Sequence, residues 1–143
     1  MASATPAEKA IKQAILDRNT ALHDKDGAAV MRSGAPGFVG YTLAPPLRNT
    51  AGKAGLQAWF ATWDGAIGHE MKDLKITAGD NVAFAHALVH MTGRKTDGDQ
   101  VDLWFRQTIG LKIFRGAWKI VHEHGSVPFY MDGSFKAAVD LKP

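Results

Sequence analysis

Hydrophobic positions in the first part of the chain recur with the spacing of a helix. Apolar residues return every three or four positions between Ala10 and Leu22, which predicts a helix with one buried face. The preceding Thr5-Pro6-Ala7-Glu8 is typical of a helix start, with a capping threonine, a proline in the first turn and the glutamate of a capping box. Similar signals predict a shorter helix that Asp26 caps and that runs through Met31, and a third helix over residues 53–62.

Later in the chain the apolar positions alternate, as they do in strands with one buried face. The alternation predicts four strands joined by turns, namely His69–Thr77, Val82–Thr92, Val101–Phe114 and Ala117–Tyr130. A short strand, Phe38–Leu43, follows a break at residues 33–37. Helices followed by a strand meander predict an α+β fold with helices on one face of an antiparallel sheet. We expect residues 1–143 to form a single domain.

The last predicted strand carries the best candidate for chemistry. Strict alternation places Trp118, Ile120, His122 and His124 on one face and Val121, Glu123, Gly125 and Val127 on the other. A one-residue β-bulge near Gly110 or Gly125 would exchange these faces. If Glu123 points into an apolar interior, loss of hydration makes its carboxylate a stronger base. The alternative is that Glu123 pairs with a nearby cation or hydrogen-bonds a helix end.

The composition narrows the classes of function. The 143 residues include no cysteine, which excludes disulfides and thiolate metal sites. The net charge is +3, with lysines and arginines scattered among acids, so nucleic acid is not an expected partner. No apolar run is long enough to span a bilayer, and we expect a cytoplasmic protein with no membrane partner. There is no glycine-rich phosphate loop, and we expect no cofactor.

Three segments carry a resemblance to a known family: Leu43-Ala-Pro-Pro-Leu47, Trp104-Phe-Arg106-Gln-Thr108, and His122-Glu-His124 followed by Ser126-Val-Pro128. With these segments and its order of elements, the chain resembles the nuclear transport factor 2-like superfamily, in its SnoaL-like and ketosteroid-isomerase-like branch. The resemblance implies a cone, in which a curved antiparallel sheet wraps around the N-terminal helices and encloses an apolar pocket. It also implies a homodimer formed through the outer face of the sheet.

The acid–base positions of that family carry other residues in this chain. By the resemblance, the general-base aspartate of ketosteroid isomerases falls on Thr42, and their oxyanion-hole tyrosine falls on Arg18. The aspartate and histidine of SnoaL-like cyclases fall on Gly125 and Glu123. The family's isomerase or cyclase chemistry is therefore not predicted. The chain resembles either a natural member that has lost its catalytic aspartates or a redesigned or evolved one.

The predicted site combines Glu123 with hydrogen-bond donors and an apolar wall. We expect His86, Tyr41 or Gln107 to donate to developing negative charge. His86 shares a strand face with His90, and both would belong to the dimer contact if that face points outward. The remaining predicted lining consists of Arg18, Ser33, Gly34, Gly40, Thr42, Trp59, Trp63, Leu103, Phe105, Val121 and Gly125. The serine and the glycines would enlarge the pocket, unless they serve backbone shape.

Two other groupings lack further partners. His122 and His124 have a spacing that can chelate zinc or copper, yet the sequence places no third ligand, so no metal site is predicted. Lys112 and Lys119 would form a Schiff base only if buried and neutral.

These observations predict a protein that binds a small apolar or aromatic molecule. If the protein is an enzyme, we expect it to transfer a proton with Glu123 as the base. The alternative is a non-catalytic homo-oligomerisation or binding module of the same fold. This alternative rests on the segment from Trp118 to His124, which resembles the ending of the association domains of protein kinases.

Overall fold

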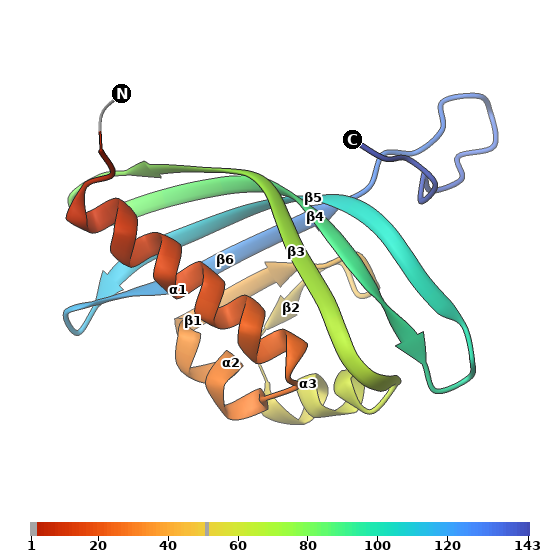
Figure 1. The fold of residues 1–143 in the computed structure, drawn as a ribbon, viewed down its shortest axis with the longest axis horizontal. Helices are drawn as coiled ribbons and strands as arrows, with labels where there is room; N and C mark the ends of the chain where they lie inside the picture. The colour runs from red at the N-terminus through yellow and green to blue at the C-terminus, as the bar shows by residue number, and fades with distance from the viewer. Residues whose placement is uncertain (1–2, 51) are drawn as a thin grey trace.

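The structure is a computed structural model that describes residues 3–50 and 52–143. Within these residues the chain forms α1 (Pro6–His23), α2 (Gly27–Ser33), β1 (Gly34–Tyr41), β2 (Asn49–Thr50), α3 (Lys53–Phe60), β3 (Trp63–Ala78), β4 (Val82–Lys95), β5 (Gln100–Phe114) and β6 (Ala117–Ser126). The predicted α+β class and the cone are confirmed. The long strands β3 to β6 form a curved sheet, and α1 lies across its concave face (Figure 1).

The predicted helix starts are confirmed at atomic detail. The Thr5 side chain accepts a hydrogen bond from the Glu8 amide at 3.1 Å, which satisfies one of the free amides at the start of α1. Asp26 does the same for Ala29 in α2, also at 3.1 Å. The apolar face of α1 is buried, with Ile11 fully covered by the sheet.

The sheet has the order β2-β1-β6-β5-β4-β3. Neighbouring strands are antiparallel except for β1 and β6, which run parallel, so the sheet is mixed rather than wholly antiparallel. This pairing also explains why β1 begins at Gly34, inside a segment that the sequence predicted to be a break. Gly34 is extended and pairs with Ile120, so contact with a distant strand overrides the local turn signal.

A β-bulge in β6 changes the predicted division of its side chains between two faces. Leu111 of β5 pairs with Ile120, but the preceding Gly110 pairs with His122, so Val121 is skipped. Trp118 and Ile120 therefore share the inner, concave face with Glu123 and Gly125, while His122 and His124 point to the outer face. The predicted grouping of Trp118 and Ile120 with the two histidines is wrong because of this bulge.

The buried side chains form two separate apolar clusters. The first contains Ile11, Ile15, Ala83, Ala85, Ile109, Leu111 and Ile120. The second contains Ala21, Val30, Phe60, Trp63 and Ile67. On α1, Arg18 lies between Ile15 of the first cluster and Ala21 of the second, and it is only 9% exposed. No helix in the described chain combines the length and apolar character needed to cross a membrane.

We expect Ile15→Ala to lower the free energy of unfolding by about 2–5 kcal/mol, because a fully buried side chain between α1 and the sheet would leave a cavity. The neighbouring Leu16 is 39% exposed and serves as control, with an expected loss below about 0.5 kcal/mol for Leu16→Ala. Urea unfolding of the two variants measures the difference. Equal losses would contradict the packing of α1 described above.

Candidate functional site

Polar side chains from four elements point into the interior of the cone. Arg18 comes from α1, His69 from β3, Gln107 from β5 and Glu123 from β6. Gln107 pairs with Gly125, two residues beyond Glu123, so Gln107 and Glu123 are diagonal neighbours on the inner face. We call Arg18, His69, Gln107 and Glu123 the interior polar cluster.

Arg18 and Glu123 form an ion pair that links α1 to β6. Glu123 Oε1 lies 2.5 Å from Arg18 Nε, and the two side chains are only 15% and 10% exposed, respectively. The contact lacks hydrogen-bond geometry at Nε. Arg18 Nη1 donates to Ser33 Oγ at 2.9 Å, and the guanidinium lies 5.3 Å from the centre of the Phe38 ring. Glu123 is thus held by a cation, as the alternative interpretation of the sequence anticipated.

Within the interior polar cluster, His69 has a shifted pKa. Burial lowers the pKa of His69 from its usual 6.5, the Arg18 charge lowers it further, and the Glu123 carboxylate acts in the opposite direction. The imidazole is therefore neutral at neutral pH. Its ring centre lies 6.0 Å from that of Phe105, in an edge-on arrangement.

Several buried polar atoms of this cluster have no hydrogen-bond partner. Among the described residues, buried side-chain atoms without a partner are Arg18 Nε, His69 Nδ1, Gln107 Oε1 and Trp63 Nε1. Buried polar atoms are normally paired, because an unmade hydrogen bond costs about 1–3 kcal/mol. Because Arg18 Nε already faces the Glu123 carboxylate, the atoms of this cluster that remain open are His69 Nδ1 and Gln107 Oε1.

Sequence reasoning missed His69, which it used only as the beginning of a strand. The strand begins six residues earlier, at Trp63, and Ile67, His69 and Met71 alternate on its inner face. An alternation traced back to Ile67 would have placed the imidazole inside the cone.

The structure places two of the predicted donors on the opposite side of the sheet from Glu123. In β4 the buried positions are Ala83, Ala85, Ala87 and Val89, so His86 and His90 point outward. The prediction that His86 shares a pocket with Glu123 is therefore wrong. His90 stacks on Trp104 at 4.5 Å between ring centres and is hydrogen-bonded to Asp102 at 2.6 Å.

Tyr41 also lies on the outer face. In the parallel pair, Gly40 is opposite Glu123 and Tyr41 is opposite His124. The Tyr41 ring centre lies 4.7 Å from that of His122 and 5.3 Å from that of His124. Its predicted role as a donor beside Glu123 is wrong because successive residues of a strand point to opposite faces.

Two of the predicted pocket glycines make room for aromatic rings rather than for a ligand. A Cβ atom at Gly125 would lie 3.3 Å from the Phe105 ring, and one at Gly40 would lie 3.3 Å from the Phe38 ring. The two rings thus fill the space that these glycines leave. Phe38 and Phe105 cover the inner face beside Glu123 as apolar walls.

The other predicted lining residues are divided among several places. Trp59 packs against the second apolar cluster, which contains Trp63, and Leu103 lies on the inner face of β5 two residues from Phe105. Gly34 joins α2 to β1, and Val121 lies at the bulge. Thr42 donates to the Ala44 carbonyl at 3.0 Å and borders a groove at the following loop.

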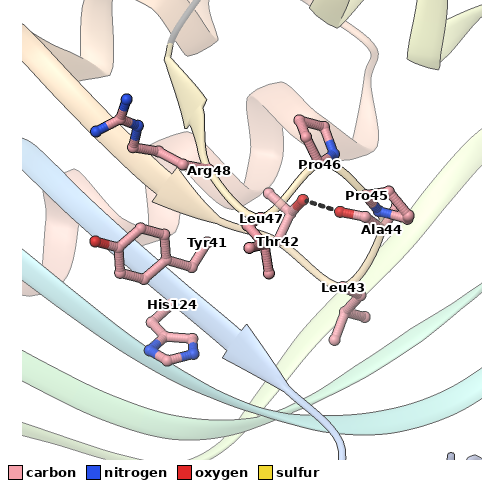
Figure 2. A pocket seen from close by; sticks show the side chains of 9 residues that line it. All are labelled: Tyr41, Thr42, Leu43, Ala44, Pro45, Pro46, Leu47, Arg48 and His124. Atoms are coloured by element: carbon pink, nitrogen blue, oxygen red, sulfur yellow. Dashed lines mark hydrogen bonds between the residues drawn. The ribbon is translucent and has the colours of Figure 1, made fainter.

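This groove has a volume of about 880 Å³ and lies between the loop that follows β1 and the outer end of β6 (Figure 2). Tyr41 and His124 border one side of it, while Leu43 and the two prolines lie on the loop. A second hollow of about 330 Å³ lies between α1, α2 and β6, and Arg18 and Ser33 line it. Within residues 3–50 and 52–143, no three histidine, aspartate or glutamate side chains come together as a metal site requires.

Comparison with known proteins gives matches that agree with this fold. The model of a SnoaL-like domain matches residues 11–130. An NTF2-like protein of unknown function from Pseudomonas putida KT2440 has 29% identity and a TM-score of 0.85, with 99% of this chain and 100% of that chain covered. Comparison with curated proteins gives no match.

Two more distant structures share the fold. A proposed scytalone dehydratase from Novosphingobium aromaticivorans has 17% identity and a TM-score of 0.73, with 82% of this chain and 81% of that chain covered. A proposed ketosteroid isomerase from Shewanella frigidimarina has 19% identity and a TM-score of 0.66, with 85% of this chain and 98% of that chain covered.

We expect Arg18→Met to lower the free energy of unfolding by about 3–5 kcal/mol, because it leaves the buried Glu123 carboxylate without its partner. The double variant with Glu123→Gln should regain most of this loss. Lys12→Met removes an exposed cation from the same helix and serves as control. A double variant that is no more stable than Arg18→Met would contradict the pairing.

We expect the stability of the protein to fall as the pH decreases from 6.5 towards the lowered pKa of His69. In this range the unfolded chain binds a proton at His69 and the folded chain does not, so acid favours unfolding. The variant His69→Gln should lose less stability over the same range. Urea unfolding between pH 7.5 and 5, about the range where histidine titrates, measures the difference, and identical pH slopes would contradict the burial of His69.

Proposed function

Because the chain belongs to the SnoaL-like domain family, whose model covers residues 11–130, we propose that the interior polar cluster binds a small aromatic or otherwise largely apolar molecule and transfers a proton on it. The observation that carries the proposal is the pair of buried atoms without partners on His69 and Gln107. A hydroxyl group of the ligand could donate to Gln107 Oε1, which only accepts, or to His69 Nδ1. Phe38 and Phe105 would contact its apolar body.

In this proposal His69 is the proton acceptor, in place of the Glu123 expected from the sequence. Glu123 is held by Arg18, whereas the neutral His69 ring has a buried nitrogen without a partner. The Glu123 carboxylate acts to raise the pKa of His69, so it would stabilise the imidazolium formed when His69 takes a proton. The Arg18 charge would stabilise negative charge that develops on the ligand oxygen.

Two of the similar structures are a proposed dehydratase and a proposed isomerase, which supports an enzymatic role for the fold. Fold alone does not determine function, so the proposal rests on the residues of the cluster.

A second candidate function is that of a non-catalytic homo-oligomerisation module, as the sequence also suggested. What favours it is the outer face of β4, where Val82 is 67% exposed and Phe84 is 49% exposed, and where His90 stacks on Trp104 further along the strand. Apolar side chains on a sheet face support a homodimer. If this is the function, stability should depend on protein concentration and not respond to aromatic ligands.

Proton transfer is tested by exchange of the α-hydrogens of a small aryl ketone for deuterium, followed by proton NMR. We expect the protein to accelerate this exchange, and His69→Gln to lower the rate by about a hundredfold, because a positioned general base contributes roughly that factor. The matched control is His86→Gln, which removes an exposed histidine from the outer face and should leave the rate unchanged. Equal rates for wild type and His69→Gln would reject His69 as the acceptor.

A further inference from the structure

The hollow between α1, α2 and β6 is separate from the contacts that Arg18 makes with Glu123. It has a volume of about 330 Å³, which is the size of a small-molecule site. Arg18 and Ser33 line it from one side, where Arg18 Nη1 donates to Ser33 Oγ, while Arg18 Nε faces Glu123. The same guanidinium therefore borders the interior polar cluster at one end and this hollow at the other.

The charged groups around the hollow are mostly cations. Arg18, Arg32 and Lys119 line it with a single carboxylate, that of Asp17, and since Arg18 is already paired with Glu123, the excess comes from Arg32 and Lys119. Asp17 accepts a hydrogen bond from the Gln13 side chain at 2.7 Å. In the described parts of the chain, neither Arg32 nor Lys119 forms an ion pair with a carboxylate. This excess of positive charge favours an anion in the hollow.

One of these cations is held at the rim by a backbone contact. Lys119 Nζ donates to the Arg32 carbonyl at 2.7 Å, which fixes the ammonium beside the end of α2. Its remaining hydrogens can bind a further acceptor, since an ammonium carries three donors. Arg32 itself also lines the hollow, so the two cations border the same space.

The rest of the lining is apolar and includes one large aromatic side chain. Trp118 is half-buried and packs against the first apolar cluster, and Ala14 and Ala29 complete the wall. A ligand that fills this space would combine a negative charge with a flat apolar body. We propose that the hollow binds a small aromatic oxyanion, with its carboxylate or phosphate group on Arg32 and Lys119 and its ring against Trp118.

Isothermal titration calorimetry with benzoate tests this proposal at constant ionic strength. We expect saturable binding, and about tenfold weaker binding for both Arg32→Gln and Lys119→Gln, because each removes a hydrogen bond to a charged group. Lys72→Gln, on the exposed side of β3, is the matched control and should leave the affinity unchanged. Ala29→Leu should abolish binding by filling the hollow, provided that its circular dichroism matches wild type.

Further ligands separate the chemical contributions. Neutral benzamide should not displace benzoate from the hollow, and phenyl phosphate should bind more tightly than inorganic phosphate because its ring contacts Trp118. Displacement of benzoate by benzamide, or an affinity for benzoate that Arg32→Gln leaves unchanged, would overturn the proposal.

The variant His69→Gln separates this hollow from the interior polar cluster. It should leave benzoate binding unchanged, because His69 does not line the hollow. If His69→Gln weakens benzoate binding and Arg32→Gln does not, the ligand occupies the interior. That result would reject the anion site and leave the proposed proton transfer standing.

Discussion

The buried ion pair between Arg18 and Glu123 is the constraint on which the interior depends. Two charges removed from water cost several kcal/mol each unless they meet, so the helix and the last strand can pack only in a register that brings these two groups together. The pair also decides the chemistry that remains available. Because Glu123 is paired with Arg18, its carboxylate is held in place, and burial leaves the nearby His69 imidazole neutral.

The pair lies in a polar layer between two apolar clusters. Ile15 and Ala21, one turn on either side of Arg18, belong to different clusters, so a single helix face passes from apolar to charged and back to apolar. A continuous apolar core would be simpler to pack and at least as stable. The retention of a charged, incompletely hydrogen-bonded layer is what a binding site requires, since a ligand can then exchange its own hydrogen bonds with water for those of the protein.

The elements set by local chemistry could be predicted from the sequence, and those set by distant contacts could not. The caps Thr5 and Asp26 act within one turn of helix, and both were predicted. Gly110 marked a possible bulge in the sequence, but that Val121 is the skipped residue depends on how β5 and β6 meet. The position of Glu123 on the inner face was expected from the family resemblance, while its cation, over a hundred residues away in the sequence, could only be named as an alternative. For His69 the alternation from Ile67 to Met71 carried a signal, whereas both faces of β4 carry apolar residues, so only the packing of the sheet shows that His86 points out.

The place of β6 in the sheet has a consequence for synthesis on the ribosome. Although it is the last strand along the sequence, β6 lies between β1 and β5, and its His122 ring donates to the Val39 carbonyl, 83 residues earlier. Until β6 emerges from the exit tunnel, β1 has no neighbour on that side, α1 has no counter-charge for Arg18, and the nascent chain keeps apolar surface uncovered. The β1–β6 pairing and the Arg18–Glu123 ion pair, which join segments far apart in the sequence, can therefore form only after β6 has been made.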